Sequence, residues 1–197
     1  MRSEYCASLS DRCSRTGRII ARPPIMTDAP TNHRKQITPA YLERAAISYL
    51  ERHASSGANL RRILARKAQR RSGGPPEEEI LMLIDQVVEK AVRSGLVDDR
   101  IYAETKTASL LRRGASARLV GARLAAKGLD RDIVGAVLSE AAPDEFAQAR
   151  RYAERRRLGP YRSVPDPARR ERDLAALARA GFSYRAASAA LDGEDPR

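Results

Sequence analysis

The chain has 197 residues, of which 42% are hydrophobic and 31% are charged. This length fits one domain or a string of small modules, and the hydrophobic fraction requires that part of the chain buries a core. No apolar run approaches the roughly 20 residues that a membrane-spanning helix needs, and residues 1–25 lack the apolar segment of a secretory signal. We therefore expect a soluble, cytoplasmic protein with no membrane partner.

The chain is strongly basic, because 37 lysines and arginines stand against 25 aspartates and glutamates, a net charge of +12. Such a charge predicts attraction to polyanions, with nucleic acid as the first candidate and an acidic protein groove as the second. A composition rich in arginine and alanine is equally typical of codon bias in a GC-rich genome. The charge alone therefore does not decide the function.

Residues 1–25 carry several arginines but no periodic apolar face that could dock on a core. We expect a disordered basic tail over residues 1–37, with Ile37 able to pack against Leu42 at its end and with Met26 as an alternative start of translation. Cys6 and Cys13 lie in this tail, and no histidine or second cysteine pair stands at metal-ligand spacing from them. We interpret both as reduced thiols and predict no metal site.

From Thr38 onward the hydrophobic spacing is helical, and no alternating strand pattern is present. Thr38 and Pro39 are typical of a helix start, and Ser55 and Ser56 are expected to end this helix and start a second one. The segment RSGGPPE at 71–77 predicts a break, and Gly95 closes a third helix. The apolar stripes of the three helices are Leu42, Ala45, Ala46, Tyr49 and Leu50, then Leu60, Ile63 and Leu64, then Ile80, Ile84, Val87, Val88 and Ala91.

The same three-helix pattern returns twice. In the second block, Asp98–Asp99, Ser116 and Asp130 precede helices, the first of which runs through Ile101, Ala108 and Leu111. In the third block, a helix with Phe146 is followed by a proline-rich connection, a helix capped by Asp166–Pro167 and a last helix from Ser183. We predict an all-α chain of tandem three-helix repeats at 38–95, 96–142 and 143–192, forming an elongated, curved molecule.

The last two blocks can be compared directly at a shift of 53 residues. Leu124, Gly128, Leu129, Val137 and Leu138 then fall on Leu177, Gly181, Phe182, Ala190 and Leu191. The matched pattern is a helix, a glycine turn, an apolar residue, a small polar cap and a second helix. A helix-turn-helix DNA reader shares this pattern, but the helix at 130–140 is acidic on balance, so we interpret it as an ordinary helix corner.

The sequence offers no catalytic constellation. Asp98 and Asp99 could act as acid and base, but their place at a helix start favours capping. His33 lies in the tail and His53 at a helix end, and no glycine-rich phosphate loop or Ser/His/Asp set is present. We predict that the protein is not an enzyme and needs no cofactor.

Three basic clusters are candidate sites for a nucleic acid or protein partner. Because the clusters lie in successive blocks, they favour one long basic surface. The alternative interpretation of each cluster is a solvated helix face. The first cluster is a row spaced four residues apart, opposite an apolar stripe. The clusters are Arg62, Arg66 and Arg70; Arg112 and Arg113; and Arg150, Arg151, Arg155, Arg156 and Arg157.

Several motifs in order resemble the RecX family of recombinase regulators. They are GLVDDRIYAE at 95–104, LLRRG at 110–114 and RLAAKGLD at 123–130, with LRRILARKA at 60–68 before them and RRRLGPYR at 155–162 and ALARAGFSY at 176–184 after them. The resemblance covers about residues 38–191. The tail and the RSGGPPE connection depart from the family pattern.

The resemblance implies a monomeric chain of three-helix repeats that binds RecA recombinase filaments on single-stranded DNA. Members of the family restrain recombination and RecA-stimulated ATP hydrolysis by blocking filament growth or promoting disassembly. Family-wide contact residues are not a sharp motif, so the site residues rest on the basic clusters. The alternatives are a helix-turn-helix or nucleoid-type protein that binds duplex DNA and a pure protein-interaction adaptor.

Overall fold

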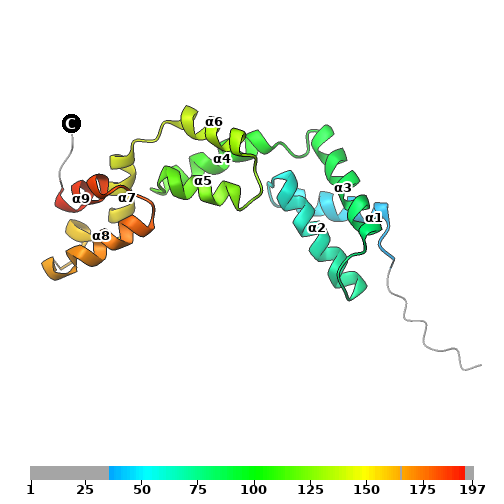
Figure 1. Ribbon diagram of the computed structural model, residues 1–197, viewed down its shortest axis with the longest axis horizontal. Helices are drawn as coiled ribbons and strands as arrows, with labels where there is room; N and C mark the ends of the chain where they lie inside the picture. Colours follow the sequence, from blue (N-terminus) through cyan, green and yellow to red (C-terminus); the bar gives the residue numbers. More distant parts are fainter. Residues whose placement is uncertain (1–35, 165, 194–197) are drawn as a thin grey trace, which may run out of the picture. The chain divides into compact units, whose positions relative to one another are not determined.

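The computed structural model describes residues 36–164 and 166–193. Within these ranges the ordered elements are helices and no strand is present, which confirms the all-α prediction. The described helices belong to one unit of the chain and group into three sets of three, here called triplets, each with its own hydrophobic core (Figure 1). Their division into independently folding repeats stays a prediction.

The first triplet consists of α1 (Pro39–Leu50), α2 (Gly57–Ser72) and α3 (Glu78–Arg93). Thr38 caps α1, as predicted, since its hydroxyl accepts a hydrogen bond from the Tyr41 amide at 3.3 Å. The predicted stripes meet in one core, with Leu42, Leu60 and Ile84 fully buried. α2 extends through Arg71 and Ser72, so the predicted break begins only where left-handed Gly73 ends the helix.

The second triplet consists of α4 (Asp99–Arg112), α5 (Ala117–Ala125) and α6 (Arg131–Ala141). Asp98, Ser116 and Asp130 each accept a hydrogen bond from an amide in the first turn of the following helix, so all three predicted caps are confirmed. The buried residues of α4 are Ala103, Thr107 and Leu110, whereas Ile101 is 61% exposed. Apolar and polar residues are mixed on both faces of α4. The apolar residues in its sequence therefore did not predict which positions are buried.

The third triplet consists of α7 (Glu145–Arg156), α8 (Arg170–Arg179) and α9 (Tyr184–Asp192), with two short 3-10 turns, Gly159–Tyr161 and Pro167–Arg169, between α7 and α8. The prediction that Asp166–Pro167 caps α8 is wrong. These residues start the second 3-10 turn, and α8 begins after Arg169 without a side-chain cap. Buried Asp173 orders the connection, since its carboxylate accepts hydrogen bonds from the Gly159 amide and the Arg162 guanidinium.

The shift of 53 residues relates structurally equivalent positions. Leu124 of α5 and Leu177 of α8 are both fully buried. Gly128 and Gly181, which follow these helices, have φ of +77° and +89°, a left-handed conformation that glycine adopts without steric cost. The predicted helix, turn and helix pattern is therefore present in both the second and third triplets.

Neighbouring triplets are joined by a repeated contact. In the first joint, the Ser56 hydroxyl donates to the Lys127 carbonyl at 2.7 Å, and in the second joint, the Ser116 hydroxyl donates to the Ala180 carbonyl at 2.6 Å. Each serine also caps its own helix by accepting an amide hydrogen bond. Each bonded carbonyl directly precedes one of the two left-handed glycines, Gly128 or Gly181.

The absence of side chains at these glycines permits the close approach. A Cβ at Gly128 would lie 2.5 Å from the Ala58 Cβ, and a Cβ at Gly181 would lie 2.8 Å from the Ser116 Oγ. Both distances are shorter than van der Waals contact. Glycine is therefore required at each joint for its conformation and for its size.

Some predictions concern residues outside the described ranges. The tail that we predict to be disordered, residues 1–37, falls there except for its last two residues, as do Cys6, Cys13 and His33. Ile37, predicted as part of the tail, packs against the core of the first triplet. Among the described helices, none is long and apolar enough to cross a membrane.

Candidate functional site

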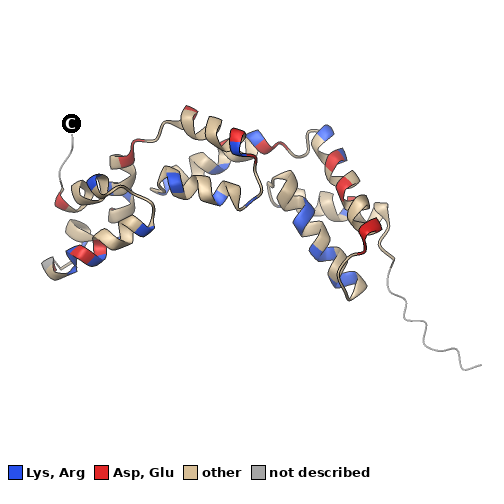
Figure 2. Ribbon diagram, viewed as in Figure 1, with Lys and Arg blue, Asp and Glu red and all other residues tan. Residues whose placement is uncertain are grey.

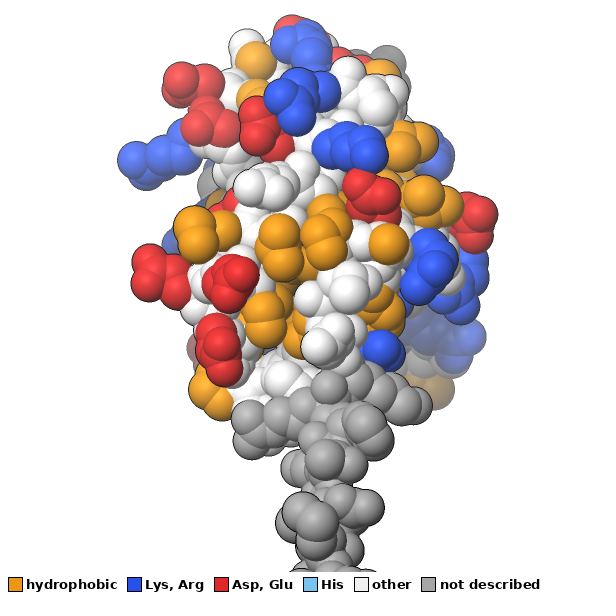
Figure 3. All heavy atoms as spheres, turned by 90° about the vertical axis from the view of Figure 1, so that its right-hand side faces the viewer, with side chains coloured by type: hydrophobic (Ala, Val, Ile, Leu, Met, Phe, Trp, Pro, Cys, Tyr) orange, Lys and Arg blue, Asp and Glu red, His pale blue; other side chains and the backbone are white. Residues whose placement is uncertain are grey.

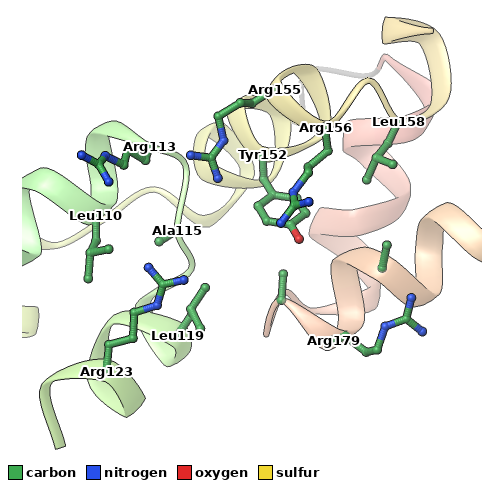
Figure 4. Close-up of a pocket in the computed structure, with 12 residues that line it drawn as sticks. Leu110, Arg113, Ala115, Leu119, Arg123, Tyr152, Arg155, Arg156, Leu158 and Arg179 are labelled. Atoms are coloured by element: carbon green, nitrogen blue, oxygen red, sulfur yellow. The ribbon is translucent and has the colours of Figure 1, made fainter. Parts of the chain in front are cut away.

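A cavity of about 670 Å³ lies between the second and third triplets, beside the second joint (Figure 4). It is lined by five arginines from four helix ends. Arg113 and Arg123 come from the second triplet, and Arg155, Arg156 and Arg179 come from the third. The cavity is therefore a shared site, which exists only where the two triplets meet.

Helix polarity explains why so many cations gather here. Arg123, Arg155, Arg156 and Arg179 lie in the last turns of α5, α7 and α8, and Arg113 is the C-terminal cap residue of α4. The last turn of a helix carries partial negative charge from its free carbonyl groups, which stabilises nearby cations. The helix ends that meet at the second joint thus partly offset the mutual repulsion of the guanidinium groups.

The rest of the lining is apolar. Leu110 and Leu119 contribute side chains from the second triplet and Leu158 contributes one from the third, and the Tyr152 ring lies beside Arg156 (Figure 4). The ring of Tyr152 is fixed by Phe182, whose centroid lies 5.7 Å away, and by the Arg156 guanidinium, also 5.7 Å from its centroid. The cavity combines cationic groups with apolar side chains and a positioned aromatic ring.

No carboxylate lines this cavity. None of its five arginines forms an ion pair with another residue of the described ranges, whereas other arginines of the chain do, among them Arg61 with Asp85 and Arg100 with Glu140. The hydrogen bond from Arg61 holds the pKa of the Asp85 carboxyl below its usual value, which shows how such a pair neutralises a cation. A concave surface with uncompensated positive charge concentrates the field that attracts anions.

Known sequences resemble this chain over most of its length, although no protein-family model matches it. The Regulatory protein RecX of Myxococcus xanthus is 38% identical over 164 residues, which cover 80% of this chain and 88% of that protein. The Regulatory protein RecX of Agrobacterium fabrum is 30% identical over 146 residues, covering 74% and 78%. The chain belongs to the RecX family.

Solved RecX structures share the fold. The crystal structure of RecX from Lactobacillus salivarius superposes with a TM-score of 0.55 at 18% identity, covering 79% of this chain and 95% of that one. A second crystal structure, of a regulatory protein RecX, gives a TM-score of 0.57 at 18% identity and covers 79% and 72%. The resemblance indicated by the motifs is thus confirmed, and tandem helical repeats agree with these structures.

The cavity of this RecX chain brings together only part of the predicted site. Arg113, Arg155 and Arg156 were predicted and line it, whereas Arg123 and Arg179 line it without having been predicted. The missed residues stand alone among alanines and leucines in the sequence, so no charge cluster marked them. Their position in the last turn before a glycine corner was the available signal.

The other predicted arginines lie elsewhere. Arg62, Arg66 and Arg70 form an exposed row along α2, and basic positions recur along this helix in Figure 2. Arg62 is engaged in the first joint, since its guanidinium donates to the Ala126 carbonyl at 2.9 Å. Arg157 caps the end of α7 with φ of +54° and lines a smaller cavity of about 470 Å³ together with Arg162.

Three predicted arginines lie outside the cavities just described. Arg112, Arg150 and Arg151 are exposed, and none of them belongs to the lining of the second-joint cavity. A single continuous basic surface that includes all three predicted clusters stays a prediction.

The first triplet carries an apolar surface on the side shown in Figure 3, where hydrophobic side chains cluster among charged ones. Ile47, Met82 and Leu96 are 50%, 54% and 60% exposed. A hollow of about 200 Å³ beside Ile47 and Leu96 is also lined by Glu43 and Lys90, which pair at 2.8 Å. Because its charges are balanced, this surface is not the candidate site for a polyanion.

The acidic pair that the sequence singled out is structural. Asp98 caps α4, as predicted, whereas the Asp99 carboxylate accepts a hydrogen bond from the Gly57 amide at 2.8 Å, at the start of α2. Asp99 therefore strengthens the first joint, a role that required the tertiary structure to find. No group of three or more potential metal ligands is present among the described residues.

Proposed function

We propose that this protein restrains RecA recombinase in the cytoplasm by binding RecA filaments on single-stranded DNA as a monomer. The observation that carries the proposal is membership of the RecX family, whose members compared above are named regulatory proteins. The cavity at the second joint supports it, because uncompensated arginines suit the phosphates of DNA or the acidic side chains of a protein surface.

The proposed action is binding, not turnover. The described side chains that drew attention as acids or bases, Asp98 and Asp99, have structural hydrogen-bond partners. A protein that binds along or at the end of a filament can limit its growth or its ATP hydrolysis without a reaction of its own. We accordingly propose a regulator that works without a cofactor.

ATP hydrolysis by the cognate RecA on single-stranded DNA tests this proposal. We expect inhibition at a molar ratio of the protein to RecA well below one, since arrest of a filament end affects many subunits. Unchanged hydrolysis at excess protein, together with tight binding to duplex DNA, would contradict the proposal and favour a direct duplex binder.

The charge of α6 argues against the duplex binder. As the second helix of a helix-turn-helix, α6 would enter the major groove, but Asp132 and Glu140 on this helix are exposed carboxylates. Glu140 is held by Arg100 at 2.7 Å, and Arg131 is the only basic residue of α6. A groove lined by phosphates disfavours such a helix.

A further inference from the structure

We propose that the cavity at the second joint binds the phosphates of single-stranded DNA directly and that the bound strand holds the second and third triplets together. The inference rests on the proposed function only for the choice of single-stranded DNA as the ligand. Its basis is the geometry of a site whose cations come from two repeats.

The composition of the lining identifies the class of ligand. Five guanidinium groups without a lining carboxylate match a chain of phosphodiesters, each of which carries one negative charge. The aromatic ring of Tyr152 in the lining suits the flat faces of unpaired bases. In a duplex the base faces are covered by stacking, and an acidic peptide has negative charge but no bases. A single strand offers both phosphates for the arginines and exposed base faces for the rest of the lining.

The size of the cavity agrees with a short stretch of strand. Its volume of about 670 Å³ lies within the roughly 300–1,000 Å³ of sites that enclose small ligands. The arginines are exposed, so the strand can enter and leave without unfolding of either triplet.

The second joint and the site share their walls. Ala115 precedes the joint serine Ser116, Ala180 supplies the carbonyl that this serine bonds at 2.6 Å, and both alanines line the cavity. Opening of the joint would therefore separate Arg113 and Arg123 from the arginines of the third triplet. By linkage, a strand that bridges both sides favours the closed joint, and a loosened joint lowers the affinity for the strand.

The first test measures binding of a fluorescein-labelled oligothymidylate to the full chain without RecA. Replacement of Arg123 and Arg155 by glutamine removes one cation from each side of the cavity. We expect affinity to fall roughly tenfold or more, since each charge-assisted contact contributes more than a neutral one. The salt dependence of binding should become shallower by about 0.7 in logarithmic slope per lost phosphate contact.

The matched control is the double variant Arg66→Gln with Arg70→Gln. It removes the same charge from the exposed face of α2, which lies in the first triplet. We expect its affinity to stay within about twofold of the parent, with the salt slope unchanged. Equal losses in both double variants would overturn the site and leave only diffuse attraction by net charge.

The second test compares the two joint serines. Ser116→Ala and Ser56→Ala each remove one helix cap and one bond between triplets, so their cost to helix stability is matched. We expect only Ser116→Ala to weaken oligothymidylate binding, by several fold at unchanged helicity. An equal effect of the two variants, or none in Ser116→Ala, would overturn the bridging role.

Two further outcomes separate this inference from the proposed function. If the cavity variant loses inhibition of RecA while its oligothymidylate binding is unchanged, the cavity meets an acidic protein surface and the DNA site is refuted. If the parent protein binds the strand through the cavity but leaves RecA hydrolysis unchanged, the site stands and the proposed function fails. Equal affinity for a duplex of the same length would refute the preference for a single strand.

Discussion

The two joints share a backbone contact but differ in the state of their cations. In the first joint, Arg62 donates to the Ala126 carbonyl at 2.9 Å and Lys127 approaches the Asn59 side-chain oxygen at 3.4 Å. In the second joint, the arginines around the cavity have no ion pair with a described residue, and Arg156 lies over the Tyr152 ring. A repeated framework thus supports a structural role at one place and a binding surface at the other.

The difference shows that a high density of basic residues in a stretch of sequence does not make their charges available to a ligand. The row that contains Arg62 is among the densest basic stretches of the chain, yet one of its members is committed to a neighbouring carbonyl. Arg123 and Arg179 come from sparse stretches, but helix packing brings them to the same cavity. A binding surface on tandem repeats has to be identified at the junctions and not along single helices.

The largest expected effect comes from closing the space at the joint glycines. In Gly128→Ala and Gly181→Ala the new methyl groups would collide with the adjacent triplet, in addition to the cost of a left-handed alanine. We expect a loss of about 2–4 kcal/mol in the free energy of unfolding, measured by urea titration. Only Gly181→Ala should also weaken oligothymidylate binding, because the proposed site lies at the second joint.

Gly95→Ala is the control for these substitutions. Gly95 has φ of +72° but no atom within 4 Å of a Cβ at that position. Its replacement by alanine should therefore cost only the roughly 1–2 kcal/mol of a left-handed residue. Equal destabilisation by all three alanines would show that the joints are not closely packed in solution.

A smaller effect is expected at the carboxylate of the first joint. Asp99→Ala removes the acceptor of the Gly57 amide and a negative charge at the start of α2, which should cost about 1 kcal/mol. Asp99→Asn retains an acceptor oxygen and should recover part of this loss. Amide hydrogen exchange at Gly57 provides the measurement, and unchanged exchange in Asp99→Ala would show that the first joint does not depend on this bond.

Arg62→Gln tests whether the cation of the first joint is structural. Loss of its bond to the Ala126 carbonyl should lower stability by about 0.5–1.5 kcal/mol, with oligothymidylate affinity nearly unchanged. Arg66→Gln, one helical turn away, should change stability by less than about 0.5 kcal/mol. A large loss of DNA affinity in Arg62→Gln alone would move the binding site to the first joint.

The smallest effect concerns an ion pair away from both joints. The hydrogen bond from Arg61 lowers the pKa of the Asp85 carboxyl in the folded chain, so this pair contributes stability above the unfolded value of about 3.9 and loses it as pH falls through the folded value. Because both side chains are about half exposed, Asp85→Asn should cost only a few tenths of a kcal/mol at neutral pH. Thermal unfolding of variant and parent should therefore differ at neutral pH and converge only when the pH is below the folded pKa of Asp85, which lies under the unfolded value of about 3.9. A difference that persists there would contradict this origin.

Helix starts and corners could be predicted from the sequence because they depend on local chemistry. Ser116 and Asp130 cap helices through their own neighbours, and Gly128 ends a helix through its own conformation. Arg179 and Asp99 escaped prediction because their roles depend on residues far along the chain. The buried role of Asp173, which accepts hydrogen bonds from Gly159 and Arg162, also had no local signal in the sequence.

The distribution of the two joint halves has a consequence for how such a chain can change in length. The first triplet supplies a donor serine, the third supplies an acceptor carbonyl with its glycine, and the second supplies both, as Ser116 and as Lys127 with Gly128. A tandem duplication of the second triplet would therefore carry its own compatible connections on both sides. Gene duplication or protein engineering could lengthen the array by whole units, and each added copy would bring Arg113 and Arg123 to a new junction.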